Sequence, residues 1–327
     1  MKYIESNSTD PYFNLALEEY VFEKLPKDEG YFMLWQNENT IVIGKYQNAA
    51  EEVNQQVVDE NNIRVARRLS GGGAVYHDMG NLNFTFVVDK KDMEGLNFKM
   101  FIAPIVETLK NFGVTAEFNG RNDITIDGKK FSGNSQYIKK GRVMHHGCIM
   151  LDSNMANVAS ALNVKAAKFQ SKNVKSVKSR VTTINANAEK KITMEEFKSA
   201  LKAHILGDSS VVPYELSEQD IKEIEKLRDE KYATWEWRYG KGAKYEMTRE
   251  EKFEAGLVTV DLTAKAGRIE GISISGDFFG NGDITELEEG LVGAVLDETL
   301  ADKLKELNLG EYMAGISAEE LSRLIRG

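Results

Sequence analysis

The chain has 327 residues, of which 42% are hydrophobic and 28% are charged, and its formal net charge is −9. These totals are typical of a globular protein whose core needs no disulfide or structural metal, and they exclude general attraction to nucleic acid or anionic membranes. The single cysteine, Cys148, excludes an internal disulfide, and no apolar run approaches the ~18 residues of a membrane span. Because the start, MKYIESNSTD, also lacks a signal-peptide core, we expect a cytoplasmic protein. The length predicts one large and one small domain.

The first third of the chain predicts one helix followed by several strands. Asp10 is a favourable N-cap and Pro11 suits the first helical turn, and apolar residues then recur at helical spacing as far as Val21. Short apolar runs bounded by polar residues are typical of buried strands. Such runs are 31–35, 40–44 and the stretch from Leu82. Between the last two lies the segment 66–81, ARRLSGGGAVYHDMGN, in which two arginines precede three consecutive glycines.

The middle of the chain predicts a β-hairpin and then a further strand. Asp127 and Gly128 favour a two-residue turn, because both central positions of that turn need a positive φ. Residues 123–126 alternate before the turn, and strand alternation after it puts three polar residues on one face. These residues are Lys130, Ser132 and Asn134. With another strand expected at 142–151, the block 123–151 predicts a β-meander.

The second half of the chain predicts further helices and a smaller domain. Residues 165–180 contain six basic residues and no acidic one. Amphipathic helices are expected at 193–206 and 217–232, and strands at 257–262 and 269–279. Two more helices should begin at Thr285 and Ser317, where glutamate follows a hydroxyl residue three positions later. We expect a boundary near residue 245, with one domain over 1–245 and another over 246–327.

The glycine run within 66–81 has the composition of an anion-binding loop. Glycine lets main-chain N–H groups approach a ligand closely, and successive N–H groups form a concave nest for anions. Arg67 and Arg68 add donors that pair well with phosphate. The alternative is a flexible surface turn. The sequence GGGAVY at 71–76 matches neither G-x-x-x-x-G-K-[ST] nor G-x-G-x-x-G, so a nucleotide held here implies another fold.

Four stretches that occur in a fixed order resemble the lipoate–protein ligase family, which belongs to the wider biotin/lipoate ligase fold. They are RRLSGGGAVYHDMGN (67–81), GRNDITIDGKKFSGN (120–134), HHG (145–147) and SVKSRVTTI (176–184). The resemblance implies an α+β fold, in which mixed, largely antiparallel sheets flanked by helices form the catalytic domain and a small α+β accessory domain follows. It also implies two reactions: lipoate and ATP give lipoyl-adenylate, and the lipoyl group then passes to a lysine of an acceptor protein.

The same resemblance implies ligands, partners and binding residues. The expected ligands are lipoate, ATP and Mg²⁺, and the expected acceptors are lipoyl domains of 2-oxoacid dehydrogenase E2 subunits and the glycine-cleavage H protein. We expect a monomer with no nucleic-acid or membrane partner. Lys130 is the expected catalytic residue. The expected binding residues are Arg68, Ser70, Gly71, Gly72, Gly73, Ala74, Val75, Tyr76, His77, Asp78, Asn81, Asp123, Lys130, Ser132, Gly133, Lys178 and Arg180.

Lys130 has a chemical reason to be catalytic. Joining a carboxylate to the α-phosphate of ATP brings two anions together, and a cation aimed between them lowers the repulsion. Lysine suits a point contact to oxygens of two different groups, whereas arginine prefers flat bidentate pairing. The alternative is a solvated hairpin lysine like Lys129. Asp123 is expected either to hold Mg²⁺ with the phosphates or to orient Lys130, and its alternative role is that of a turn aspartate.

The lipoyl tail needs an apolar slot, for which Val75, Tyr76 and Ile43 are candidate wall residues. Burying about four methylenes contributes roughly 3 kcal/mol. A purely apolar slot barely separates lipoate from octanoate. Because the adenylate must be shielded from water, the 165–180 stretch and the C-terminal domain are candidate covers, and the basic stretch is also a candidate contact for an acidic acceptor.

The histidines and the cysteine carry weaker expectations. His145 and His146 are adjacent on a strand and so point to opposite faces, which argues against a metal site. His77 is expected to orient its loop, and Cys148 to pack within its strand. Two functional alternatives stay open: an octanoyltransferase with a cysteine acyl-enzyme, for which Cys148 is the available thiol, and a non-catalytic lipoate- or nucleotide-binding protein. Pyrophosphate release from ATP and lipoate separates a ligase from both.

Overall fold

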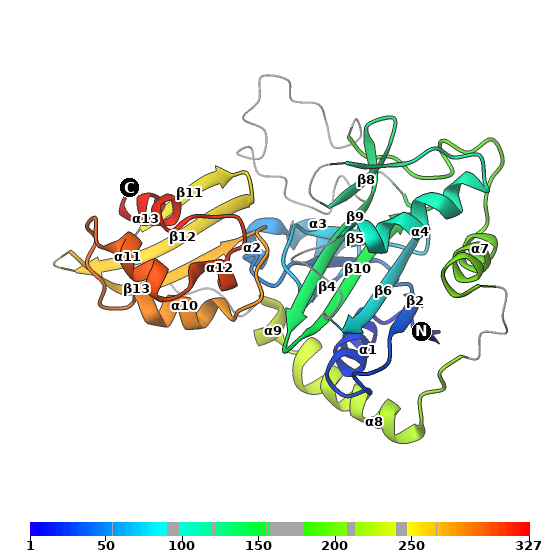
Figure 1. Cartoon of the computed structure of the whole chain (residues 1–327), viewed down its shortest axis with the longest axis horizontal. Helices are drawn as coiled ribbons and strands as arrows, with labels where there is room; N and C mark the ends of the chain where they lie inside the picture. Colours follow the sequence, from blue (N-terminus) through cyan, green and yellow to red (C-terminus); the bar gives the residue numbers. More distant parts are fainter. Residues whose placement is uncertain are drawn as a thin grey trace.

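A computed structural model describes residues 1–53, 55–89, 98–119, 122–154, 156, 180–207, 213–239, 247–265 and 267–327. Figure 1 shows a large unit that holds the N-terminus and a smaller unit that holds the C-terminus. The boundary expected near residue 245 and the expected binding residue Lys178 lie outside the described residues. The basic stretch 165–180 also lies outside them, apart from Arg180.

A seven-stranded sheet forms the centre of the large unit. In spatial order its strands are β1 (Lys2–Glu5), β2 (Tyr31–Trp35), β6 (Asn81–Asp89), β10 (Arg142–Met150), β9 (Lys129–Lys139), β8 (Asp123–Ile126) and β7 (Glu117–Asn119). Among these described strands, β1 and β2 alone run parallel, and the other neighbours are antiparallel. The expected strands at 31–35 and from Leu82, and the β-meander over 123–151, are therefore confirmed.

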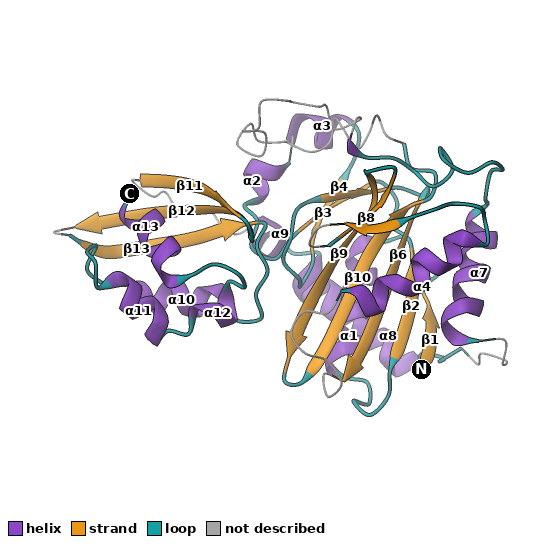
Figure 2. Cartoon of the chain, turned by 45° about the horizontal axis from the view of Figure 1, so that its top comes forward, coloured by secondary structure: helices purple, strands orange, loops and turns teal. Residues whose placement is uncertain are grey.

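Helices cover both faces of this sheet (Figure 2). The helices on one face are α1 (Pro11–Glu23), α8 (Glu218–Leu227) and the π-helical turn η3 (Arg228–Tyr232), and those on the other are α4 (Lys99–Lys110) and α7 (Met194–Leu206). Strand alternation supplies both cores, because Phe84 and Phe86 of β6 pack on the α4 side and Val87 packs on the α1 side. Asp10 caps α1 as predicted, accepting a hydrogen bond from the N–H of Tyr12.

A second, three-stranded sheet carries the glycine run. Its strands, in spatial order, are β4 (Arg64–Arg67), β3 (Thr40–Ile43) and β5 (Val75–His77). Strand β4 is parallel to β3 and β5 is antiparallel, so the loop 68–74 between them crosses the carboxyl end of β3. The short helices beside this sheet are α2 (Ala49–Glu52), α3 (Gln55–Glu60) and α9 (Trp235–Tyr239). The two strands expected at 31–35 and 40–44 thus belong to different sheets.

The hairpin between β8 and β9 contains a β-bulge. Asp127 and Gly128 form its turn with φ values of 49° and 72°, as predicted. Beyond the turn the register shifts, because Lys130 and Ser132 pair with consecutive residues of β8. Phe131 is therefore an extra residue on β9, and it packs in the buried core.

The bulge changes the direction of the lysine. Lys130 lies on the side of Gly133, with its Nζ 2.9 Å from the position that a Cβ on this glycine would occupy. Ser132 and Asn134 stay together on the other side, where the Asn134 amide lies 3.5 Å from the Ser132 hydroxyl. The expectation that Lys130 shares a face with these two residues is wrong, because one inserted residue reverses the alternation.

The smaller unit is a three-stranded sheet with helices. Its elements are β11 (Met247–Phe253), β12 (Gly256–Lys265), β13 (Arg268–Gly276), α10 (Ile284–Leu291), α11 (Leu300–Glu306), α12 (Leu309–Tyr312) and α13 (Ala318–Arg326). Ser317 and Glu320 form the capping box predicted for α13. The helix expected to begin at Thr285 instead begins at Ile284, because Asp283 accepts a hydrogen bond from the Thr285 N–H and is the N-cap.

The segment after β13 joins the smaller unit to the large one. Phe279 packs in the core on the α4 side of the large sheet. Tyr46 stacks on Phe278 with ring centroids 4.8 Å apart. The N–H of Gly72 donates to the carbonyl oxygen of Phe278 at 3.2 Å. The C-terminal unit is therefore in direct contact with the glycine run.

Gly44 lies where the loop 68–74 crosses β3, and a Cβ at Gly44 would overlap the carbonyl oxygen of Gly72. We expect Gly44→Ala to lower the free energy of unfolding by about 1–3 kcal/mol, the usual range for overpacking. Urea denaturation followed by circular dichroism measures the change. Gly310→Ala is the control, because among the described residues no atom outside its chain neighbours and its own helix backbone lies within 4 Å of a Cβ there. Equal losses in the two variants would contradict the close approach.

Candidate active site

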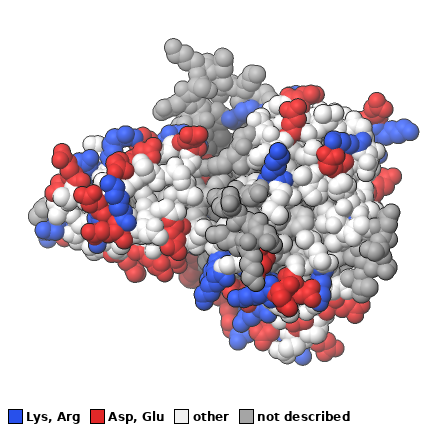
Figure 3. Space-filling model, viewed as in Figure 1, with Lys and Arg blue, Asp and Glu red and all other residues white. Residues whose placement is uncertain are grey.

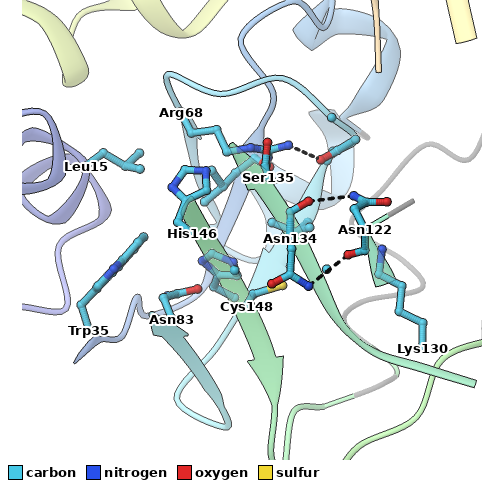
Figure 4. Close-up of a pocket in the computed structure, with 18 residues that line it drawn as sticks. Leu15, Trp35, Arg68, Asn83, Asn122, Lys130, Asn134, Ser135, His146 and Cys148 are labelled. Carbon is cyan, nitrogen blue, oxygen red and sulfur yellow. Dashed lines mark hydrogen bonds between the residues drawn. The ribbon is translucent and has the colours of Figure 1, made fainter. Parts of the chain in front are cut away.

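A cavity opens on the α1 side of the large sheet, where that sheet meets the glycine run (Figure 4). The residues expected from the sequence that line it are Arg68, Gly72, Gly73, Ala74, Val75, His77, Lys130 and Gly133. The other described members of the expected set do not line it: Ser70, Gly71, Tyr76, Asp78, Asn81, Asp123, Ser132 and Arg180. The glycine run and the hairpin lysine, which are far apart in sequence, thus face one cavity.

Sequence reasoning missed much of the remaining wall. The wall residues outside the expected set are Leu15, Trp35, Val42, Asn83, Asn122, Asn134, Ser135, His146, Gly147 and Cys148. Tyr76 and Ile43, expected to hold the acyl tail, pack instead in the core of the small sheet. Their strand neighbours Val75 and Val42 face the cavity, because successive side chains on a strand point to opposite faces.

Strand pairing aligns a row of cavity residues across the sheet. Trp35 of β2 pairs with Asn83 of β6, Asn83 pairs with Cys148 of β10, and Cys148 pairs with Gly133 of β9. Neighbouring strands are ~4.8 Å apart, so the row is roughly 14 Å long. Lys130 stands beside Gly133 at one end, and Figure 4 shows Trp35 at the opposite side of the cavity. The cavity is long enough for an extended acyl chain.

The loop between β4 and β5 is folded around the guanidinium of Arg68. Its Nη2 donates to the carbonyl oxygens of Gly71 (2.7 Å) and Gly73 (2.9 Å), its Nη1 donates to that of Val42 (3.2 Å), and its Nε donates to the Ser70 hydroxyl (3.2 Å). Burial lowers the pKa of Arg68 to about 10, which leaves the group charged at neutral pH. The glycine run therefore surrounds a fixed positive charge.

Arg67 differs from its expected role. Its guanidinium donates to five main-chain carbonyl oxygens, those of Gly44, Lys45, Gln47, Trp237 and Arg238. These hydrogen bonds tie α9 to the loop that follows β3. Arg67 does not line the cavity, and the phosphate contact expected for it finds no support in this geometry.

Lys130 is held by one carboxylate. Its Nζ forms an ion pair with Asp123 Oδ1 at 2.7 Å, and the two side chains are 33% and 35% exposed. The N–H of Thr182 donates to the carbonyl oxygen of Lys130 at 2.8 Å, which ties the segment after Arg180 to the lysine. Within the described ranges, no group of three or more His, Cys, Asp or Glu residues is placed to hold a metal ion.

A buried chain of hydrogen bonds connects α1 to the glycine run. His146 Nδ1 lies 2.9 Å from Glu18 Oε1, and His146 Nε2 lies 2.5 Å from the Ser70 hydroxyl. Ser70 also accepts from Arg68. Glu18 and Ser70 are each 1% exposed, so the chain is shielded from water. It positions the cavity residue His146 and the start of the loop relative to one another.

His145 and His146 point to opposite faces, as expected. The ring of His145 stacks on that of Phe101 with centroids 4.6 Å apart, on the α4 side of the sheet. Burial lowers the pKa of His145 well below its ordinary value. Burial also lowers the pKa of His77 to about 3, with a smaller contribution from the charge of Arg68. Both imidazoles are therefore neutral at physiological pH.

A buried positive charge and a lysine in one elongated cavity suit a ligand that has an extended chain and anionic groups. Two family models match the chain, the Lipoyl protein ligase A/B catalytic domain over residues 10–206 and the Bacterial lipoate protein ligase C-terminus over residues 243–325. The chain is 47% identical to lipoate–protein ligase 1 of Staphylococcus aureus over 327 residues, which cover 99% of this chain and 100% of the relative. The chain belongs to the lipoate–protein ligase family.

Solved structures share the fold. LipL1 of P. falciparum in complex with lipoate matches with a TM-score of 0.78 at 24% identity, over 99% of this chain and 98% of that chain. Lipoate-protein ligase A bound with ATP matches with a TM-score of 0.61 at 24% identity, over 73% of this chain and 98% of that chain. The expected α+β fold, with largely antiparallel sheets flanked by helices and a separate C-terminal unit, is confirmed.

Ser70→Ala removes the hydroxyl that His146 and Arg68 share. Because it leaves two buried polar groups without their partner, we expect the free energy of unfolding to fall by about 1–3 kcal/mol in denaturant titrations. Ser322→Ala is the matched control, since Ser322 is 1% exposed and its hydroxyl has no hydrogen-bond partner among the described residues. A Ser70 variant as stable as this control would show that the buried chain contributes nothing to the fold.

The two neutral histidines predict loss of stability in mild acid. In the unfolded chain each imidazole binds a proton below a pH of about 6.5, whereas the folded chain keeps both neutral because their pKa values are lowered. The unfolded state therefore binds more protons, and the free energy of unfolding falls by about 1.4 kcal/mol per pH unit for each group as the pH drops below 6.5. Denaturant titrations between pH 7.5 and pH 5 measure the slope. A constant value over this range would contradict the burial of the neutral rings.

Proposed function

We propose that this chain activates lipoate with ATP as lipoyl-adenylate and then transfers the lipoyl group to a lysine of an acceptor protein. One observation carries the proposal: in a member of this family, Lys130 and the glycine run built around Arg68 line one cavity. In the first reaction, a carboxylate oxygen of lipoate attacks the α-phosphorus of ATP, and pyrophosphate leaves. In the second, the acceptor amine attacks the acyl carbonyl carbon, and AMP leaves with the bonding electron pair.

Each cavity residue has a role in these reactions that follows from its position. Lys130 lies at the end of the cavity where the acyl carboxylate meets the α-phosphate, and its ammonium lowers the repulsion between the two anions. Arg68 supplies a fixed charge behind the glycine run and donates to the carbonyl oxygen of Gly73. The main chain of Gly73 lines the cavity without a side chain, which would let phosphate oxygens approach closely. The Gly72 N–H donates to Phe278, so the anion nest expected at 71–73 is partly occupied by the C-terminal unit. We propose that Gly73 and the following residues supply the remaining contacts.

We propose Mg²⁺ as a companion of the nucleotide. Asp123 forms an ion pair with Lys130 through its Oδ1. Magnesium in nucleotide sites is commonly held by phosphates and water with few protein carboxylates. Asp123 is therefore the residue that would contact the ion, and the ion would neutralise phosphate charge when bound.

We propose a catalytic domain over 1–245 and an accessory domain over 246–327, which act as a monomer. The C-terminal unit has its own sheet and core and touches the glycine run through Phe278, which supports a role in covering the site. The proposed cover and acceptor contact at 165–180 lies outside the described residues, apart from Arg180. Among the described helices, none is long and apolar enough to cross a membrane.

The proposed acceptors are the lipoyl domains of 2-oxoacid dehydrogenase E2 subunits and the glycine-cleavage H protein. On the face drawn in Figure 3, acidic and basic side chains are interspersed over both units. With a net charge of −9, this distribution supports a protein acceptor and not a nucleic acid. Mass spectrometry of a candidate lipoyl domain after incubation with the chain, lipoate, ATP and Mg²⁺ tests the transfer directly.

One observation favours the acyl-enzyme alternative: Cys148 lines the cavity. It lies on β10 and pairs with Gly133 of the neighbouring strand β9. A cysteine acyl-enzyme takes a preformed thioester and needs no ATP. The two functions therefore differ in a single assay: release of pyrophosphate from ATP and lipoate without any acceptor. Absence of release, together with loss of acyl transfer in Cys148→Ser, would favour the alternative.

Lys130→Ala should slow pyrophosphate release by roughly 10²–10³-fold, the usual effect of removing one donor that stabilises a transition state. A coupled pyrophosphate assay with lipoate and ATP measures the rate. Lys129→Ala is the matched control, because Lys129 is the exposed neighbour on the same strand and should leave the rate unchanged. If both variants release pyrophosphate at the parental rate, the assignment of Lys130 fails.

A further inference from the structure

The end of the cavity remote from Lys130 is not wholly apolar. Trp35 and Leu15 stand there, on the far side from Lys130 in Figure 4. Two buried polar side chains also belong to the wall, His77 at 3% exposure and Asn83 at 1%. The ring of His77 lies edge-on to that of Trp35 with centroids 6.3 Å apart, and Asn83 pairs with Trp35 across the strands. The two polar groups therefore stand at the same end of the cavity.

The hydrogen bonds of Asn14 and Asn37 fix which nitrogen of His77 carries its proton. Asn14 Nδ2 donates to the carbonyl oxygens of Ser8 and Gln36, each at 2.9 Å, which fixes the orientation of its amide. The same amide nitrogen faces Asn37 Oδ1 at 3.0 Å. Asn37 therefore presents its Nδ2 to His77 Nδ1, at 3.2 Å. His77 Nδ1 is the acceptor, and the proton of the neutral ring is on Nε2.

That Nε2–H group is a donor with no acceptor. Within the part of the chain that the structure describes, His77 Nε2 is buried and has no hydrogen-bond partner. Since the pKa of His77 is lowered to about 3 by burial, the ring does not gain a second proton at physiological pH. An unpaired N–H group in a buried site is costly unless a ligand satisfies it.

Asn83 supplies a second unpaired donor. Its Oδ1 accepts from Asn81 Nδ2 at 3.0 Å, which leaves its own Nδ2 to face elsewhere. This Nδ2 has no hydrogen-bond partner among the described residues. The nearby indole of Trp35 does not need such an acceptor, because its N–H donates to the Thr85 hydroxyl at 3.0 Å. Two N–H groups at the end of the cavity remote from Lys130 thus lack an acceptor that a ligand could supply.

We propose that His77 Nε2 and Asn83 Nδ2 recognise a weak acceptor at the end of the acyl chain, the ring sulfurs of lipoate, and thereby select a dithiolane-ended acid over a methyl-ended acid such as octanoate. This inference rests on the proposed function. Divalent sulfur accepts weak hydrogen bonds, whereas a terminal methyl group accepts none. An octanoyl chain would therefore exclude water from both donors without offering them another acceptor. A site whose polar groups are left unpaired in this way rejects a ligand more strongly than an apolar slot does.

Binding of three acids to the full chain tests the proposal. The acids are lipoate, octanoate and 5-cyclopentylpentanoate, which keeps the five-membered ring and replaces both sulfurs by methylene groups. Isothermal titration calorimetry without ATP should give a dissociation constant for lipoate about tenfold lower than that for the cyclopentyl acid. Equal binding of lipoate and the cyclopentyl acid would overturn the proposal, because shape alone would then explain the selection.

Two variants locate the effect. Asn83→Leu has a similar volume without a donor, and we expect it to reduce the preference for lipoate over the cyclopentyl acid by several-fold, mainly through weaker lipoate binding. His77→Phe should act in the same direction and provides a second test if the first variant fails to fold, as judged by its melting temperature. Asn61→Leu, at an exposed position outside this cavity, is the control and should keep the parental preference. An unchanged preference in the folded variants would overturn the proposal.

This outcome is separable from that of the proposed function. If the chain prefers lipoate over the cyclopentyl acid but releases no pyrophosphate with ATP, the proposed adenylation is wrong and the inference about His77 and Asn83 stands. If pyrophosphate release depends on Lys130 but the acids bind equally, the function stands and the inference fails.

Discussion

The guanidinium of Arg68 is the group on which the architecture of the site depends. It is buried and charged, and it donates to the Ser70 hydroxyl and to the carbonyl oxygens of Val42, Gly71 and Gly73. A buried charge without such acceptors is strongly destabilising, so the arginine and the loop fix one another. Lysine could not replace it, because a single ammonium group cannot reach acceptors spread around a flat fork. The hydrogen bonds of Arg68 therefore stabilise this shape of the loop without a ligand.

The two ends of the cavity carry different polar groups. Lys130, paired with Asp123, brings a charge to the end where phosphate chemistry would occur, and the guanidinium of Arg68 lies along the wall, where its charge also contributes to the lowered pKa of His77. At the other end the polar groups are neutral: His77 is held unprotonated by burial, and Asn83 is an amide. The low dielectric inside the protein strengthens electrostatic interactions at the Lys130 end. It also raises the free-energy cost of leaving the donors at the other end unpaired. One cavity can thus separate reactivity from recognition of the acyl tail, because the two depend on different groups.

Long-range hydrogen bonds hold this arrangement in place from the side of α1. Glu18 of that helix reaches His146 on β10, and His146 reaches Ser70 at the start of the glycine run. The C-terminal unit reaches the same run through the carbonyl of Phe278. The loop is therefore held from both sides, by the buried core of the large sheet and by a separate unit that binds one of its amides. A ligand that needs the Gly72 amide must compete with that contact.

The sequence by itself determined the features that depend on near neighbours. Asp10 and Ser317 cap helices, Asp127 and Gly128 form the hairpin turn, and the apolar runs become strands, because each depends on residues within a few positions. The composition of the glycine run also predicted an anion-binding loop, and the family resemblance supplied the role of Lys130. Tertiary structure decided the direction of Lys130, since a bulge is set by which residues of β8 and β9 pair. Tertiary structure also brought Trp35, Asn83 and Cys148 into one row and placed Glu18 against His146. Strand order and long-range pairing cannot be read from the local sequence pattern.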